Sequence, residues 1–322
     1  MRFRTLVLSF ALAFAAAAPA AAATNWSVIV GGQTPDVSVY ANGFFPQQLT
    51  IHTGDTVTWQ FDGFHNVSFL SGMPAPGFAT KDGTSYVGNP QVFFPAGSSE
   101  YDGTGFHNSG VPPSDKPFSY TITFTKAGHY EYACTIHPGM AGVINVTDGP
   151  VTETPDAALA RGKAEQAASV AAGAKAYREL KPQIKGKNVV VRLVGNKQQR
   201  FSLLRYMPDP LTIAAGTTVT WTIDDPYEVH TITFARDTKL PELIVPQPQP
   251  GGAPKLVLNP LVLTPTSTST YDGTGWVNSG LLGGPGTGNP SSFKLTFTKP
   301  GTYVYWCLVH DHENQQGTII VK

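Results

Sequence analysis

An internal duplication constrains this chain more than any other feature of its sequence. Three blocks recur in the same order, at residues 46–59, 101–110 and 130–137 in the first half and at residues 208–221, 271–280 and 303–310 in the second. The first pair reads PQQLTIHTGDTVTW and PDPLTIAAGTTVTW, the second YDGTGFHNSG and YDGTGWVNSG, and the third YEYACTIH and YVYWCLVH. Since 322 residues suffice for two domains of ordinary size, each half should form the same small domain.

Within each half, apolar and polar residues alternate with the period of a β-strand. Val57, Trp59 and Phe61 share one face of such a run. Similar runs lie at residues 120–124, 129–134, 142–146, 293–297, 302–307 and 317–321. The chain also holds 33 glycines and 27 prolines, which punctuate these runs as turns do. The pattern predicts an all-β protein made of two Greek-key barrels or sandwiches in tandem.

The stretch between the halves has helical character. Thr154 can cap a helix, Pro155 suits its first position, and the helix should end near Leu180. A weakly apolar stripe, expected to rest on a barrel, is formed by Leu159, Gln166, Val170 and Tyr177. Gly162 and Gly173 weaken this prediction, and a flexible alanine-rich linker is the alternative.

We expect domains at residues 24–148 and 188–322, joined by a linker at 149–187, after an export signal at 1–23. The signal begins Met-Arg-Phe-Arg, has a short apolar run and ends in small residues. A retained membrane anchor is the alternative, but the run is short for a span. We therefore expect a periplasmic or secreted protein whose mature chain does not insert into a membrane. Lys+Arg and Asp+Glu are both 22, so nothing points to nucleic acid.

Two cysteines, Cys134 and Cys307, occupy equivalent places in the repeat, and each is followed three positions later by a histidine. A disulfide between them is one interpretation for an exported protein. Equivalent positions in two separate domains, however, would not normally lie within disulfide reach. We therefore favour a role for each cysteine within its own domain.

A metal site is indicated in the first half by the segment Cys134-Thr-Ile-His137-Pro-Gly-Met140. A loop of this shape brings a thiolate, an imidazole and a thioether around one point. A further imidazole can come from His65, which follows a glycine-containing turn at the start of a strand. Thiolate, imidazole and thioether ligands together suit copper that carries electrons. The alternatives are a buried structural cysteine and zinc, although zinc sites rarely include methionine.

These residues resemble the cupredoxin family, especially its plastocyanin-like branch, in which a distant His-Asn pair joins a Cys-x-x-His-x-x-Met loop. The resemblance spans essentially the whole mature chain, once per half, apart from the linker. It implies a type 1 (blue) copper site with His65, Cys134 and His137 as equatorial ligands and Met140 as the axial ligand. It also implies that Asn66 braces the cysteine loop.

The second half keeps only part of this pattern. His230, Cys307 and His310 match the first three ligands, but Thr231 replaces the bracing asparagine and the methionine is missing. An axial ligand would be Glu313 if positions are counted forward from the histidine, and Gln315 if they are counted back from the final strand; His312 is a rival. We expect a second copper site with a different potential. A metal-free structural domain is the alternative.

Three further histidines, His52, His107 and His129, are absent from the second half, so we expect them at the surface rather than as ligands.

Together these features predict an exported electron-transfer protein that cycles between Cu(I) and Cu(II), not an enzyme. The resemblance implies that His137 lies near the surface, where a redox partner would dock beside Pro138 and the Phe44-Phe45 pair. A copper carrier or storage protein of the envelope could use the same ligands. An oxidase or reductase would need further His-x-His pairs and a His-Cys-His run, and the chain has only His310-Asp-His312.

Overall fold

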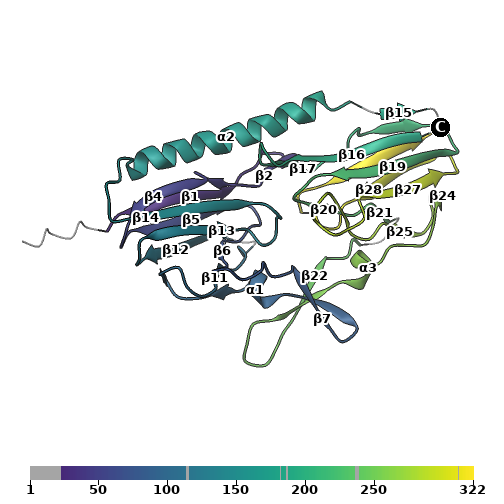
Figure 1. The fold of residues 1–322 in the computed structure, drawn as a ribbon. Helices are drawn as coiled ribbons and strands as arrows, with labels where there is room; N and C mark the ends of the chain where they lie inside the picture. Colours follow the sequence, from purple (N-terminus) through teal and green to yellow (C-terminus); the bar gives the residue numbers. More distant parts are fainter. Residues whose placement is uncertain (1–22, 114–115, 182, 186–187, 236–238, 311) are drawn as a thin grey trace, which may run out of the picture.

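Two β-sandwiches stand end to end in the computed structural model, which describes residues 23–113, 116–181, 183–185, 188–235, 239–310 and 312–322. The expected export signal lies almost wholly outside these residues. The predicted all-β fold with a duplicated domain is confirmed, and the sheets form open sandwiches rather than closed barrels (Figure 1). None of the described helices is long and apolar enough to span a membrane.

The first sandwich is built from two sheets. One has the strand order β10 (Glu100–Tyr101), β12 (Ser119–Phe124), β5 (Thr56–Asp62), β1 (Asn25–Gly31) and β3 (Phe44–Phe45). The other has the order β4 (Gln48–His52), β14 (Ala141–Thr147), β13 (Gly128–Ala133), β6 (Ser68–Phe69), β11 (His107–Ser109) and β9 (Pro95–Ala96). The short helix α1 (Pro90–Phe93) precedes β9.

The second sandwich repeats this plan. One sheet has the order β2 (Val39–Ala41), β17 (Phe201–Leu203), β16 (Asn188–Asn196), β19 (Thr217–Asp224), β27 (Ser292–Phe297) and β24 (Thr270–Tyr271), with β15 (Gln183–Lys185) beside β16. The other has the order β18 (Leu211–Ile213), β29 (Gln316–Val321), β28 (Gly301–Trp306), β21 (Thr233–Ala235) and β25 (Trp276–Asn278). A short pair is formed by β20 (Val229–His230) and β26 (Leu282–Gly283), and the helix α3 (Pro260–Leu263) precedes β24.

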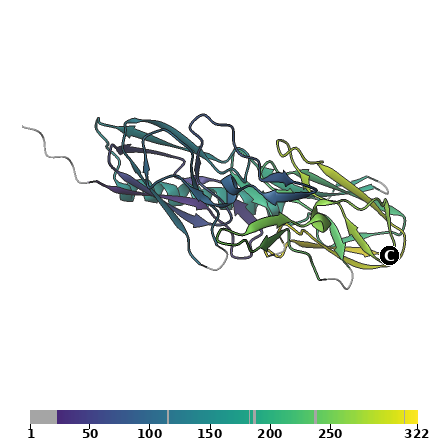
Figure 2. The same ribbon diagram turned by 90° about the horizontal axis from the view of Figure 1, so that it is seen from below.

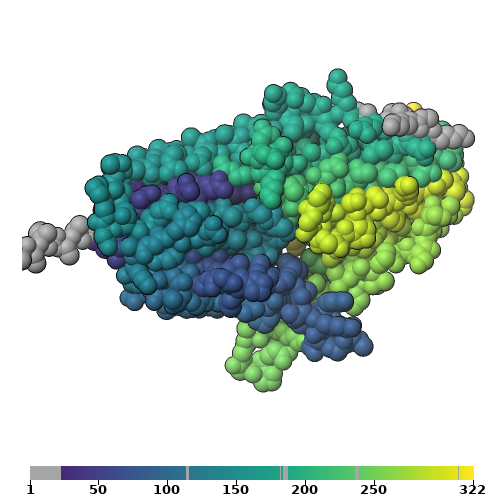
Figure 3. Space-filling view, in the orientation of Figure 1, coloured from purple at the N-terminus to yellow at the C-terminus, as the bar shows by residue number. Residues whose placement is uncertain are grey.

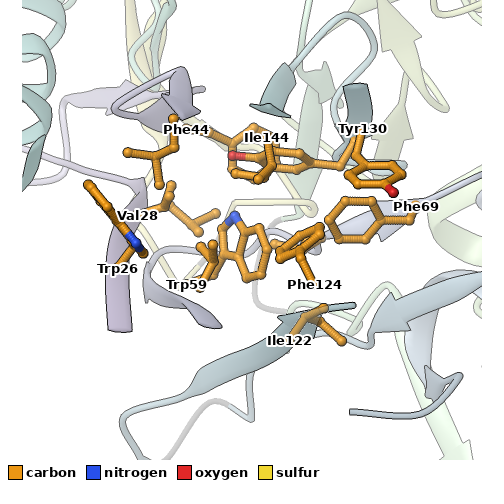
Figure 4. Close-up of a cluster of buried hydrophobic side chains, with 14 of the residues drawn as sticks. Trp26, Val28, Phe44, Trp59, Phe69, Ile122, Phe124, Tyr130 and Ile144 are labelled. Atoms are coloured by element: carbon orange, nitrogen blue, oxygen red, sulfur yellow. The ribbon is translucent and has the colours of Figure 1, made fainter. Parts of the chain in front are cut away.

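A tryptophan lies at the centre of each core. Trp59 on β5 is fully buried, and its ring packs against Phe69, Phe124 and Tyr132 (Figure 4). Trp221 makes the same kind of contacts in the second sandwich. Alternate residues of β5 thus point into one apolar core, as the period of two predicts.

The two sandwiches share strands. β2 belongs to the first half by sequence, yet it pairs with β17 of the second half, with Tyr40 opposite Ser202. A four-stranded sheet also crosses the seam, with the order β22 (Ile244–Gln247), β23 (Lys255–Leu258), β8 (Ser85–Gly88) and β7 (Ala79–Asp82). Figure 3 shows the two halves in close contact along this seam, and Figure 2 shows the elongated body that results.

The predicted helix is α2 (Pro155–Glu179), capped by the Thr154 hydroxyl, and it runs along both sandwiches (Figure 1). Its buried face differs from the stripe we predicted, because it consists of the small residues Ala158, Gly162, Ser169 and Gly173. A Cβ atom at Gly162 would lie 2.6 Å from the backbone oxygen of Phe45, and one at Gly173 would lie 2.3 Å from the Val39 side chain. The glycines that weaken the helix as a sequence therefore let it approach the strands.

Candidate metal centres

In the first half, three donor side chains meet at one end of the sandwich. Cys134 directly follows β13, His137 lies in the next loop, and His65 lies between β5 and β6. Their exposed fractions are 3%, 4% and 0%. The Nδ1 atoms of the two rings are 2.9 Å apart, and the Cys134 Sγ is 3.6 Å from Nδ1 of His137. One ligand atom from each residue lies within 4.8 Å of the others.

The cysteine loop is closed by its own backbone. The amide of Cys134 donates to the carbonyl of Met140 at 3.0 Å, and the amide of Met140 donates to the carbonyl of His137 at 3.1 Å. Gly139 turns the chain at a φ of +85°, where other residues are strained. The Met140 side chain is 1% exposed and joins the core cluster that includes Cys134.

Asn66 ties this loop to the rest of the sandwich. Its Oδ1 accepts from the amide of Thr135 at 2.8 Å, and its Nδ2 donates to the Thr135 hydroxyl at 2.8 Å and to the carbonyl of Val92 at 3.0 Å. These contacts give Asn66 the geometry of the bracing residue that the sequence resemblance implies.

The local electrostatics favour a thiolate. Burial alone would raise the pKa of the Cys134 thiol, but the His137 and His65 imidazoles beside it outweigh burial and hold that pKa well below its usual range. Burial lowers the pKa of His65 itself, which favours a neutral ring that can bind a metal. A thiolate and two imidazoles, all shielded from water, are a donor set that fits copper.

The second half repeats the arrangement. Cys307 Sγ lies 3.4 Å from Nδ1 of His310 and 3.9 Å from Nδ1 of His230, and all three side chains are buried. Both cysteines are free and each lies in its own core, so the disulfide interpretation does not hold.

The loop geometry separates the candidates for the missing methionine. Gln315 is fully buried, and it makes the two backbone hydrogen bonds that Met140 makes: the amide of Cys307 donates to its carbonyl at 2.9 Å, and its own amide donates to the carbonyl of His310 at 3.1 Å. His312 is 77% exposed at its side chain and lies beside Glu242. Glu313 is only partly buried. Gln315 is therefore the structural counterpart of the methionine.

The replacement of the bracing asparagine by Thr231 weakens the attachment of the second cysteine loop less than the sequence suggests. The hydroxyl of Thr231 accepts from the amide of Leu308 at 2.8 Å, the bond that corresponds to the one between Asn66 and the residue after the first cysteine. Thr231 thus gives the second cysteine loop one side-chain hydrogen bond, and its own amide lies 3.4 Å from the Cys307 Sγ, whereas Asn66 gives the first loop two side-chain hydrogen bonds.

The two centres face each other across the seam. His137 and His310 each turn Nε2 away from the cysteine and towards Glu228, whose Oε1 lies 3.3 Å from His137 and whose Oε2 lies 3.2 Å from His310. Burial alone would raise the pKa of Glu228, but the two imidazoles outweigh it and keep that pKa well below its usual range. Sequence reasoning missed this residue, because it stands where the first half has Gly63 and belongs to no repeat.

This contact corrects the expected docking surface. His137 is not near the surface, since Glu228 covers its outer edge. Phe44 and Phe45 are also fully buried, the first in the core and the second beneath the Arg200 guanidinium at 4.6 Å. Among the residues predicted there, Pro138 alone is exposed.

The other histidines stand apart from both centres. His129 is exposed and His52 is partly buried, but His107 is buried rather than at the surface. Its ring packs against Tyr101, and its Nε2 lies 3.0 Å from the carbonyl of Glu100, so it fills a structural position.

A β-sandwich that buries a thiolate and two imidazoles at one end is typical of copper-binding domains of the cupredoxin type. This chain contains two such sandwiches. Residues 36–147 match the family model of the copper binding proteins of the plastocyanin/azurin family. Amicyanin of Paracoccus denitrificans is 31% identical over 101 residues, 31% of this chain and 54% of that protein, so the chain spans about half the length of this curated relative. The family model thus covers the first half of the chain, and the two His/Cys/His groups, one in each half, are consistent with copper as the metal.

Solved structures give weaker likenesses. An oxidised variant of amicyanin is 18% identical, overlaps 44% of this chain and 92% of its own, and has a TM-score of 0.25. A variant plastocyanin of a fern is 25% identical, overlaps 41% and 99%, and has a TM-score of 0.23. At these TM-scores the overlaps carry no argument.

Proposed function

We propose that this protein is an exported electron carrier with two type 1 copper centres and no enzymatic activity. The first centre would use His65, Cys134, His137 and Met140 as ligands. The second would use His230, Cys307, His310 and Gln315.

The burial of the donor side chains carries this proposal. None of the six thiolate and imidazole donors is more than 8% exposed. A centre that only gains and loses an electron needs no open coordination position, whereas a copper enzyme must admit its substrate to the metal. A carrier must release its copper to a recipient, and side chains enclosed in this way oppose release. The burial therefore favours electron transfer over both alternatives.

Export and a partner complete the proposal. The amino-terminal segment supports export to the periplasm or the outside, where a redox partner protein would exchange electrons with the chain. Since the edge of His137 is covered, the partner would reach the first loop at the exposed Pro138 beside it.

Copper reconstitution of the full chain tests the proposal. We expect two coppers per chain, each with blue absorption and the paramagnetic resonance signal of a type 1 site. Cys134→Ser and Cys307→Ser should each remove one copper's blue band and leave the other. The control is His129→Ala, because the His129 side chain is exposed and contacts Glu131 and Asn145 rather than either cysteine. This variant should change neither band. A Cys134→Ser variant that keeps both blue bands would contradict the proposal.

A further inference from the structure

Glu228 is the one acidic side chain that the described residues place against both cysteine loops. It is 5% exposed and sits between rings that are themselves 4% and 8% exposed. Each carboxylate oxygen faces a different ring: Oε1 faces His137 of the first half and Oε2 faces His310 of the second. Burying a carboxylate costs free energy unless both of its oxygens have partners. Glu228 therefore needs the His137 and His310 rings together.

The segment that carries Glu228 is itself fixed at the seam. Oδ1 of Asp225 accepts from the amides of Tyr227 at 2.9 Å and Glu228 at 3.3 Å, and from the Ser202 hydroxyl at 2.9 Å. Ser202 in turn accepts from the Asn42 amide of the first half at 2.8 Å. The Tyr227 ring lies in the core cluster of the first half. The carboxylate is therefore held by a built interface rather than by a free loop.

We propose that Glu228 joins the two copper centres into one redox unit, so that an electron passes between them within the chain along His137, Glu228 and His310. This inference rests on the proposed function, since it needs copper at both centres. With copper bound at both centres, one copper would go from Cu(I) to Cu(II) while the other went from Cu(II) to Cu(I). The exchange forms or breaks no covalent bond, releases no proton and needs no further reactant.

The chemistry of the bridge explains why a carboxylate is required. When Nδ1 of an imidazole binds a metal, Nε2 keeps the proton and becomes a hydrogen-bond donor. Two such donors converge here, and a carboxylate accepts both, one at each oxygen. A glutamine has one acceptor oxygen and an NH₂ group that meets the second donor head-on. Glu228→Gln therefore breaks the bridge on one side while keeping the shape of the side chain.

The test uses the copper-loaded full chain and a brief pulse of reducing radicals that supplies less than one electron per molecule. The electron's redistribution is followed by the two blue bands and by paramagnetic resonance of rapidly frozen samples. We expect a first-order redistribution whose rate is independent of protein concentration. Glu228→Gln should slow it several-fold, because one of the two hydrogen bonds of the bridge is lost, with two coppers still bound. Glu242→Gln removes the same charge from the surface near His312 and should leave the rate unchanged.

Two results would overturn the inference. One is a wild-type rate that rises in proportion to protein concentration, because transfer then occurs between molecules; this measurement needs no variant. The other is an unchanged rate in copper-loaded Glu228→Gln, or, if that variant does not fold, in Glu228→Asp, which keeps the charge but is too short to reach both rings. Failure of the wild type to give two blue centres would instead contradict the proposed function.

Discussion

Gln315 places its side-chain Oε1 3.1 Å from Nδ1 of His230, on a loop closed by the same two backbone hydrogen bonds that position Met140 in the first half. An amide oxygen is a harder donor than a thioether and favours Cu(II) over Cu(I). The second centre should therefore have the lower reduction potential of the two.

Exchanging these two residues should move the potentials in opposite directions. We expect Gln315→Met to raise the potential of the second centre and Met140→Gln to lower that of the first, because each change swaps the oxygen and sulfur donors. Redox titration followed at each blue band measures both. The unmodified centre of each variant serves as the internal control, and a potential that stays fixed after its own axial change would remove that residue as a ligand.

Asn66→Ala should destabilise the protein more than Thr231→Ala does. The first change removes three hydrogen bonds from a buried site, and the second removes two, the bond to the Leu308 amide and the bond between the Thr231 and Thr233 hydroxyls. We expect a loss of about 2–4 kcal/mol in the free energy of unfolding for Asn66→Ala and about 1–2 kcal/mol for Thr231→Ala. Denaturant unfolding of the copper-loaded chains measures both. Equal losses would show that the two braces are equivalent.

Gly173→Ala should destabilise the protein although alanine is the better helix former. The propensity gain is about 1 kcal/mol, but the new Cβ would lie 2.3 Å from Val39 on β2. Overpacking of this kind costs about 1–3 kcal/mol, so we expect a net loss, measured by thermal unfolding. Ala171→Ser on the exposed side of α2 is the control and should change little. A more stable Gly173→Ala would mean that the helix moves away easily.

Asp225 should make the protein less stable as the pH rises. Burial, followed by repulsion from Glu228, raises its pKa from 3.8 to about 6. The folded chain then holds this proton more tightly than the unfolded chain does, so the free energy of unfolding falls between about pH 4 and pH 6 and is level above, a loss of about 3 kcal/mol.

Asp225→Asn should remove that slope, because it keeps the acceptor oxygen and cannot ionise. Unfolding measured from pH 4 to pH 8 compares the variant with the wild type, and the exposed neighbour variant Asp224→Asn should retain the wild-type slope. Parallel profiles for Asp225→Asn and the wild type would show that Asp225 is not the group responsible.

Local sequence patterns predicted the strands, the helix start and the metal centre that depend on residues close together in the chain. The alternation around Trp59 placed β5, Thr154 and Pro155 placed the start of α2, and the spacing of Cys134 and His137 placed the first centre. Each of these signals lies within a few residues of the structure that it specifies.

Contacts between the halves left no such signal. Phe45 is an aromatic residue of the kind found at docking surfaces. Only the positions of Arg200 and α2 in the structure show that it is covered. The buried face of α2 consists of small residues because the strands beneath it leave no room, which no periodicity of apolar residues reveals. Glu228 has an ordinary sequence context, and its role depends on two rings that lie 91 and 82 positions away along the chain.

The pairing of β2 with β17 bears on whether either half can exist alone. A first half expressed by itself would carry Val39, Tyr40 and Ala41 as an unpaired strand with open backbone hydrogen-bonding groups, and would expose Phe45 to water. Such edges promote self-association. We therefore expect the duplicated domains to be stable only as a pair, and excision at the sequence boundary to yield an aggregating fragment rather than a smaller copper protein.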